Sequence, residues 1–308
     1  MKTGSYYSAG KLLLSGEYLV LHGAKALAVP LKLGHRMNVI KGGKDSIIQW
    51  KTNVLGKEWF SCRFLLPDLE IIESSDEKTG EFLKTVLLAC SSLNPDDLSS
   101  ENSYKIQSDL EFDIRWGLGS SSSLVSNLAW WLNIDPYLLF KKVFPGSGYD
   151  VFCARAKKPI LFQLKRLMPL CEEAAFNPSF RDHLYFVYLG NKQDSQKSVI
   201  EFKSSSILND KDLKEISSLT EQMITCDHLE DFMRIMNRHE EILSSILKLK
   251  KIGEERFHDF RGAVKSLGAW GGDFVMAAAL EPESEARKYF SERGYDVFFR
   301  YDELAAGF

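Results

Sequence analysis

Two glycines and a run of serines lead directly into an amphipathic segment, GLGSSSSLVSNLAWWL, at residues 117–132. The first N–H groups of a helix have no partner inside it, and its positive dipole end lies there, so such a junction can bind an anion. Glycine permits close backbone approach, and serine hydroxyls bind phosphate oxygens or magnesium. The segment predicts a phosphate-binding loop; a glycine turn followed by a serine N-cap is the alternative.

Three further segments place a charged residue beside a turn. GAWGGDF, residues 268–274, lies between a predicted helix and an apolar run, and it forms either a phosphate-facing loop or a helix cap with a tight turn. In GSGYDV, Asp150 can cap a helix or accept a proton from a substrate hydroxyl. In SAGKLLLSGEYLVLHG, Lys11 begins an apolar run, where a buried ammonium needs an anionic partner.

The elements that must position these residues alternate between strand and helix patterns. In the first half we expect strands at 11–21, 26–33, 59–66 and 104–114, and helices at 80–93 and 120–132. In the second half we expect strands at 183–190, 274–280 and 295–300, and helices at 228–249, 254–267 and 282–293. This order predicts an α+β fold in two layers, with one domain at 1–165 and a second at 166–308.

The composition narrows the class of ligand. The chain has 308 residues and a formal charge of −3, from 39 Lys and Arg against 42 Asp and Glu, which argues against a dedicated nucleic-acid binder. Its five cysteines form no CxxC pair, so neither a disulfide framework nor a cysteine zinc site is expected. No run of about 18 apolar residues occurs. We expect a cytoplasmic protein with a small-molecule substrate and no membrane contact, and the aromatic content allows a homodimer.

In their order along the chain, these motifs resemble those of the GHMP kinases, the superfamily of galactokinase, homoserine kinase, mevalonate kinase and phosphomevalonate kinase. AGKLLLSGEYLVLHGAKALAVPL resembles their N-terminal motif, GLGSSSS their phosphate loop and GAWGGDF their C-terminal glycine motif. GSGYDV and KSLGAWGGD look most like phosphomevalonate kinases, and GEYLVLHG is nearer to mevalonate kinases. The resemblance implies a ribosomal-protein-S5-like N-terminal lobe, a ferredoxin-like α/β C-terminal lobe and a nucleotide cleft between them.

The resemblance also implies an activity, in which the γ-phosphoryl group of ATP passes, with Mg²⁺, to a mevalonate- or phosphomevalonate-like acceptor in isoprenoid biosynthesis. Asp150 matches the aspartate that orients or deprotonates the acceptor hydroxyl, and Lys11 matches the lysine that stabilises the incipient alkoxide. Ser121 matches the serine that contacts the metal. The other matches are Gly117, Leu118, Gly119, Ser120, Ser121, Ser122 and Ser123 for ATP, Gly268, Gly271, Gly272 and Asp273 for the glycine loop, and Glu17, His22, Gly148, Tyr149 and Ser195 for the acceptor.

Some positions depart from the family pattern. Trp116 precedes the phosphate loop, and Trp270 replaces a glycine of the third motif. Ser120 and Asp150 are only 30 residues apart, and the helix that bears the magnesium-binding glutamate of mevalonate kinases is lost with this shortening. A phosphorylated acceptor needs additional cations near Asp150, and the candidates are Arg155, Lys157, Lys158, Lys192 and Lys197. The alternative is that they are solvated surface residues. A sugar or amino-alcohol kinase, a diphosphomevalonate decarboxylase and a kinase-like protein without catalysis remain alternatives.

Overall fold

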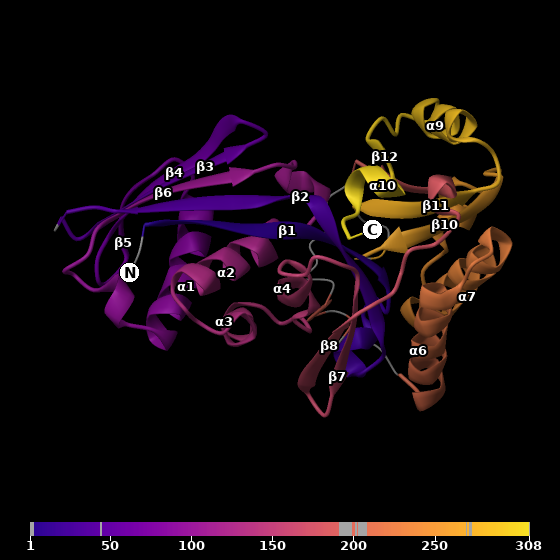
Figure 1. Cartoon of the computed structure of the whole chain (residues 1–308), viewed down its shortest axis with the longest axis horizontal. Helices are drawn as coiled ribbons and strands as arrows, with labels where there is room; N and C mark the ends of the chain where they lie inside the picture. Colours follow the sequence, from indigo (N-terminus) through magenta and orange to yellow (C-terminus); the bar gives the residue numbers. More distant parts are fainter. Residues whose placement is uncertain are drawn as a thin grey trace.

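The computed structural model describes residues 3–43, 45–190, 199, 200, 202, 208–268, 270 and 273–307. Two β-sheets organise it, one in each half of the chain (Figure 1). Among the described helices, none is long and apolar enough to cross a membrane. The fold is therefore mixed α+β with two lobes, as predicted.

The larger sheet belongs to the first half of the chain. Its strands are β1 (Gly4–Ser15), β2 (Ala26–Lys41), β3 (Ile47–Val54), β4 (Lys57–Leu65), β5 (Glu70–Ser74), β6 (Tyr104–Leu110), β7 (Ile160–Lys165) and β8 (Met168–Glu173). They run in the order β5-β4-β3-β6-β2-β7-β8, with β1 paired to β2. The predicted domain boundary after residue 165 falls in the β7–β8 hairpin, both strands of which belong to this sheet, and the boundary stays a prediction.

Helices pack against one face of this sheet (Figure 1). They are α1 (Glu77–Leu93), α2 (Ser120–Trp131), α3 (Pro136–Val143) and α4 (Tyr149–Cys153). The Asp76 carboxylate accepts the N–H of Thr79 at 2.8 Å, which caps the start of α1. The apolar faces of α1 and α2 meet the sheet in one buried cluster that includes Leu87, Leu128 and Ile106. This packing fixes the start of α2, and with it the predicted phosphate loop.

The smaller sheet belongs to the second half. Its strands are β9 (Leu184–Tyr188), β10 (Gly262–Leu267), β11 (Phe274–Ala279) and β12 (Phe298–Arg300), all paired antiparallel in the order β10-β11-β9-β12. Its helices are α6 (Asp210–Thr225), α7 (Leu229–Leu247), α8 (Ile252–Arg256), α9 (Glu283–Ser291) and α10 (Tyr301–Leu304). Alternation along β11 buries Val275 with Phe290 of α9 and Met276 with Met236 of α7, so both faces are covered.

Two of the predicted elements are wrong, one in each half of the chain. The helix expected at 254–267 ends at Arg256, and residues 262–267 form β10. Ala263 and Leu267 join one buried cluster while Val264 joins another, which is the two-residue period of a strand. The strand expected at 11–21 ends at Ser15 and is followed by the 3₁₀ helix η1 (Leu19–His22). The glycine motif at 268–273 therefore connects two antiparallel strands.

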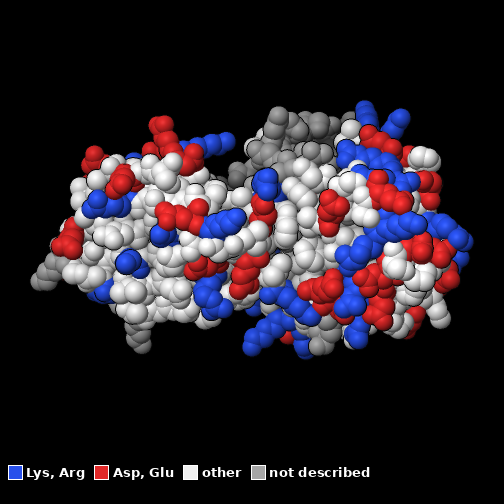
Figure 2. All heavy atoms as spheres, turned by 90° about the horizontal axis from the view of Figure 1, so that it is seen from above, with Lys and Arg blue, Asp and Glu red and all other residues white. Residues whose placement is uncertain are grey.

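A continuous apolar core joins the two halves. Leu12 of β1, Leu19 of η1 and Leu267 of β10 belong to the same buried cluster. Trp116, just before the phosphate loop, lies edge-on to Phe299 with ring centroids 5.6 Å apart. The face shown in Figure 2 carries intermixed charges of both signs, more densely over the second half of the chain. Apolar residues of both halves thus pack together at the joint between them.

Candidate active site

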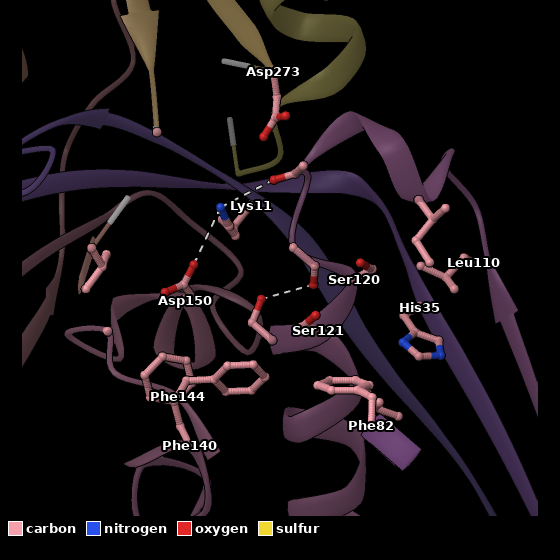
Figure 3. A pocket seen from close by; sticks show the side chains of 18 of the residues that line it. Lys11, His35, Phe82, Leu110, Ser120, Ser121, Phe140, Phe144, Asp150 and Asp273 are labelled. Atoms are coloured by element: carbon pink, nitrogen blue, oxygen red, sulfur yellow. Dashed lines mark hydrogen bonds and ion pairs between the residues drawn. The ribbon is translucent and has the colours of Figure 1, made fainter. Parts of the chain in front are cut away.

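One cavity gathers most of the residues that the sequence singles out. It has a volume of about 740 Å³, and residues of both halves line it (Figure 3). The predicted residues on its wall are Lys11, Gly117, Gly119, Ser120, Ser121, Ser122, Tyr149, Asp150, Gly268 and Asp273. Four segments that are far apart in the sequence therefore meet at one place.

Lys11 and Asp150 form the charged centre of this cavity. The Lys11 Nζ lies 3.5 Å from the Asp150 Oδ1 and donates to the carbonyl of Gly117 at 3.4 Å. The Lys11 backbone N–H donates to the carbonyl of Leu118 at 2.8 Å, which ties β1 to the glycine loop. Only 13% of the Lys11 side chain and 20% of the Asp150 side chain are exposed. Asp150 is thus the anionic partner that the buried ammonium needs, and the ammonium lies between this carboxylate and the loop (Figure 3).

Tyr149 supports the same pair from the start of α4. The Lys11 Nζ lies 5.6 Å from the centre of the Tyr149 ring. Burial, and then the neighbouring Asp150 carboxylate, raise the pKa of Tyr149 well above its ordinary value. The phenol therefore stays protonated at neutral pH, so it adds no second negative charge beside Asp150.

The glycine loop is shaped for a close approach. Gly117 and Gly119 have φ values of 68° and 93°, which favour glycine. A Cβ on Gly117 would lie 1.8 Å from the Asp273 Oδ2, and one on Gly119 would lie 3.0 Å from the Lys11 Cγ. Gly119 is the N-cap of α2 and provides no side-chain cap, while Ser120 to Ser122 line the cavity. The start of α2 thus presents its positive end to the cavity.

Buried hydrogen bonds hold the start of α2 against the sheet. The His35 Nδ1 lies 3.2 Å from the Ser123 Oγ, and its Nε2 lies 2.5 Å from the Ser108 Oγ. Burial lowers the pKa of His35 to about 4, so the ring is neutral at pH 7 and has one donor and one acceptor nitrogen. Ser123 and Leu118, both predicted to bind ATP, are buried and lie outside the cavity lining. Ser123 contacts His35 and the Leu118 carbonyl accepts the Lys11 N–H, so both residues support the loop, and their contact with ATP stays a prediction.

An aromatic arm of the cavity is absent from the sequence predictions. It extends between the sheet and the helices of the first half, and Figure 3 shows Phe82, Phe140 and Phe144 on its wall. Trp50 of β3 and Phe60 of β4 complete it. In the sequence these residues have the period of buried core positions, and nothing local separates a residue on a cavity wall from one in a filled core. The arm suits a flat, largely apolar group.

Glu17 and His22 are predicted acceptor residues that do not line the cavity. Glu17 is 2% exposed and pairs with Lys265, far from solvent. The His22 ring lies edge-on to Phe202, with centroids 5.9 Å apart. Gly148 is the N-cap of α4, directly before Tyr149 and Asp150. Lying outside the described residues are Ser195, Gly271, Gly272, Lys192 and Lys197.

The described members of the predicted cation set lie elsewhere. Arg155 donates to the Oγ and the carbonyl of Ser126, both at 3.2 Å, and stacks over Trp130. Lys158 pairs with Glu173 at the surface, at 3.1 Å. Neither residue lines the cavity, and nor does Lys157. These three side chains therefore supply no charge to a group bound beside Asp150.

Oxygen donors for a hard cation are present in the cavity. Within the described ranges, no three His, Cys, Asp or Glu side chains form a group that could hold a metal. The Ser121 hydroxyl and the Asp150 carboxylate line the same cavity. Mg²⁺ in nucleotide sites takes one or two protein oxygens and completes its shell with phosphates and water. These two side chains fit that kind of site.

The sequence matches no family model and no curated protein. Solved structures do match along the whole chain. Mevalonate kinase from Methanococcus jannaschii is 20% identical, with a TM-score of 0.69 over 100% of this chain and 99% of that one. Phosphomevalonate kinase from Streptococcus pneumoniae, solved with phosphomevalonate and AMPPNP, is 18% identical, with a TM-score of 0.69 over 96% and 99%.

A galactokinase from Lactococcus lactis, complexed with galactose, is 15% identical, with a TM-score of 0.69 over 99% of this chain and 93% of that one. Three kinases with different acceptors thus share one architecture with this chain. The chain therefore has the fold that these kinases share, as the resemblance to the GHMP kinases predicted. The acceptor is a separate question, because identities of 15 to 20% establish the fold alone.

Proposed function

We propose that this protein is an ATP- and Mg²⁺-dependent kinase that transfers the γ-phosphoryl group to a hydroxyl of a small molecule bound beside Asp150. The observation that carries the proposal is the Lys11–Asp150 pair, 3.5 Å apart, in the cavity that also holds the start of α2. A carboxylate, an ammonium and an anion-binding helix end are the groups that phosphoryl transfer requires.

Each group has a distinct task. The Asp150 carboxylate accepts a hydrogen bond from the acceptor hydroxyl and takes its proton as the new P–O bond forms. The Lys11 ammonium, next to that carboxylate and to the Gly117 carbonyl, stabilises negative charge on the attacking oxygen and on the phosphoryl group. The N–H groups at the start of α2 bind the phosphates. Mg²⁺, held by Ser121 and Asp150 together with the phosphates, would supply further neutralisation of their charge.

The shape of the cavity supports an orientation for the nucleotide. The phosphates lie at the start of α2, so the aromatic arm beyond it receives the base. The opposite side, next to Asp150, then receives the acceptor. Leu13 and Val20 line that side and pack in one buried cluster with Tyr149.

The residues of this wall also indicate which class of acceptor fits. Leu13 and Val20 suit a hydrocarbon portion, whereas a sugar needs many hydrogen-bond partners. Within the described part of the predicted cation set, Arg155 and Lys158 are committed to Ser126 and Glu173, so neither binds the phosphate of a phosphorylated acceptor. Of the two acceptors that the sequence suggests, we therefore propose the mevalonate-like alcohol over its phosphorylated form.

The test is ADP release with Mg-ATP over a panel of acceptors: mevalonate, phosphomevalonate, diphosphomevalonate, galactose and homoserine. Wild type should respond most to mevalonate. Asp150→Asn should lower acceptor-dependent turnover by about 10²- to 10⁴-fold, and the variant should still bind Mg-AMPPNP. Asp68→Asn, at an exposed carboxylate in a loop, is the matched control and should behave as wild type.

Two results would contradict the proposal. If Asp150→Asn is as active as wild type, the carboxylate is not the group that handles the acceptor proton. If nucleotide binds but no acceptor stimulates ADP release, the alternative of a kinase-like binding protein gains support. A preference for phosphomevalonate would overturn the choice of acceptor and the step in which Asp150 takes a hydroxyl proton, and it would leave the kinase function standing.

A further inference from the structure

A cluster of buried titratable residues lies at the joint between the two halves and outside the cavity lining. Its members are Glu17, His239, Glu240 and Lys265, each between 0 and 2% exposed. They come from three places: the turn after β1, the middle of α7 and the centre of β10. Four titratable groups so deep in a protein need an explanation, because burying each of them is costly.

The contacts in the cluster cross the joint. The Lys265 Nζ donates to the Glu17 Oε1 and, at 2.9 Å, to the carbonyl of Ser266. The His239 Nε2 accepts the N–H of Gly16 at 3.1 Å. On the next residue of α7, the Glu240 Oε1 accepts the N–H of Ser266 at 3.2 Å. The turn of the first half is thus bonded to β10 directly through Glu17 and indirectly through α7.

Stability alone does not account for this ion pair. A buried pair replaced by apolar residues of similar volume is often as stable or more so, whereas loss of one partner is strongly destabilising. Glu17 and Lys265 are surrounded by the apolar core that joins the halves, in which Leu12 and Leu267 lie. An apolar pair would fit such surroundings, so the pair is better explained by the positions that it fixes.

What the pair fixes is part of the cavity wall. Tyr18, directly after Glu17, has a φ of 60°, a strained conformation for a tyrosine, and lines the cavity. Its hydroxyl accepts the N–H of Trp270 at 2.8 Å. Lys265 lies three residues before Gly268, which also lines the cavity. Two adjacent residues of one turn therefore hold β10, through Lys265, and the middle of the β10–β11 connection, through Trp270.

We propose that Glu17 is a positioning residue which, through Lys265, holds Tyr18 and the β10–β11 connection in place on the acceptor side of the cavity and does not contact the acceptor. The proposal rests on the proposed kinase function for its kinetic consequence. It differs from the role that the motif match implies for Glu17, which is direct acceptor binding. Its consequence is selective: the acceptor side depends on the pair, and the nucleotide side does not.

The experiment compares Glu17→Gln, Lys265→Met and the double variant in the full chain. Either single change should raise the KM for the acceptor about tenfold or more and leave the affinity for Mg-AMPPNP within twofold. Hydrogen exchange should become faster in residues 262–268 of the ligand-free protein. The double variant should recover thermal stability relative to the single variants, because no charge is left unpaired, and should keep the high KM.

Glu221→Gln is the matched control, because Lys25 and Glu221 form an ion pair across the same joint at the surface. It should change none of these quantities. The proposal is overturned if the single variants lose thermal stability while KM and exchange stay at wild-type values, or if acceptor and nucleotide binding weaken equally. If wild type shows no acceptor-dependent turnover, the kinase function fails, and the exchange of residues 262–268 still decides whether Glu17 positions this connection.

Discussion

Replacement of Gly117 by alanine is the sharpest test of how the cavity is built. Gly117 belongs to the phosphate loop of the first half, and Asp273 ends the glycine motif of the second half. A Cβ on Gly117 would lie 1.8 Å from the Oδ2, 2.3 Å from the Cγ and 2.9 Å from the Cβ of Asp273. Rotation of the carboxylate alone would leave the last of these contacts too short, so the loop or Asp273 must move.

Gly56 provides the control for backbone strain. Its φ is 77°, close to the 68° of Gly117, and no atom lies within 4 Å of the Cβ that alanine would add. A left-handed conformation costs a non-glycine residue about 1–2 kcal/mol, so both variants should lose about this much stability. Only Gly117→Ala carries the additional overlap with Asp273. The difference between the two variants therefore isolates that contact.

The assay is the affinity for Mg-AMPPNP by calorimetry, beside thermal unfolding. Gly56→Ala should unfold a few degrees lower, at about 2–4 °C per kcal/mol, and bind with unchanged affinity. Gly117→Ala should bind at least about tenfold more weakly, equivalent to about 1.4 kcal/mol, because the phosphate loop is displaced. Asp273→Ala in the Gly117→Ala background should recover part of the unfolding temperature. Equal nucleotide affinity in Gly117→Ala and Gly56→Ala would refute the reasoning.

Three further predictions concern other parts of the site. Lys11→Met should slow acceptor-dependent ADP release by about 10²- to 10³-fold, measured in a coupled assay, and turnover within twofold of wild type would contradict its role. Burial lowers the pKa of His35 to about 4 in the folded protein, whereas in the unfolded chain the imidazole has a pKa of about 6.5. Between these two values the unfolded chain binds a proton that the folded protein does not, so the free energy of unfolding should fall as the pH drops from about 6.5 to 4. The loss is on the order of 3 kcal/mol. In urea unfolding, His35→Gln should reduce the difference in free energy of unfolding between pH 7 and pH 4.5. If the variant keeps the wild-type difference, His35 is not its cause. Phe140→Ala should weaken Mg-AMPPNP about tenfold and leave inorganic triphosphate binding unchanged, and an equal loss for both ligands would move the base out of the aromatic arm.

The charged centre of the site could be predicted from the sequence because its signals are local. Gly117 and Gly119 stand where the backbone is left-handed, and the serines follow at the start of a helix. Lys11 begins an apolar run in which an unpaired ammonium would be costly, so a carboxylate partner had to exist. Asp150 fulfils this requirement from 139 positions away, at 3.5 Å. Local signals marked the loop and the lysine, whereas the resemblance of the ordered motifs to the GHMP kinases is what implied that Asp150 lies with them.

Local sequence signals could not predict the aromatic arm of the cavity or the strand β10. Trp50 and Phe60 alternate with polar residues as any half-buried strand does, and this pattern records burial without showing what a side chain faces. In β10, a lysine in the middle of a short apolar run is equally compatible with a helix. The partner that allows Lys265 to be buried in a strand is Glu17, 248 residues away. A contact of this separation leaves no trace in the neighbouring sequence.

Glu17 and Tyr18 show why a motif match locates a site more reliably than it assigns the role of each residue. Both belong to the GEY segment that resembles the N-terminal motif. The strained φ of Tyr18 turns the chain so that one side chain enters the cavity and the other enters the joint between the halves. A substitution at Glu17 would therefore impair the acceptor side without a direct contact there, and activity alone would not reveal the difference. Hydrogen exchange at β10 separates the two roles. A positioning role predicts faster exchange there after substitution of Glu17, whereas direct acceptor binding predicts no change.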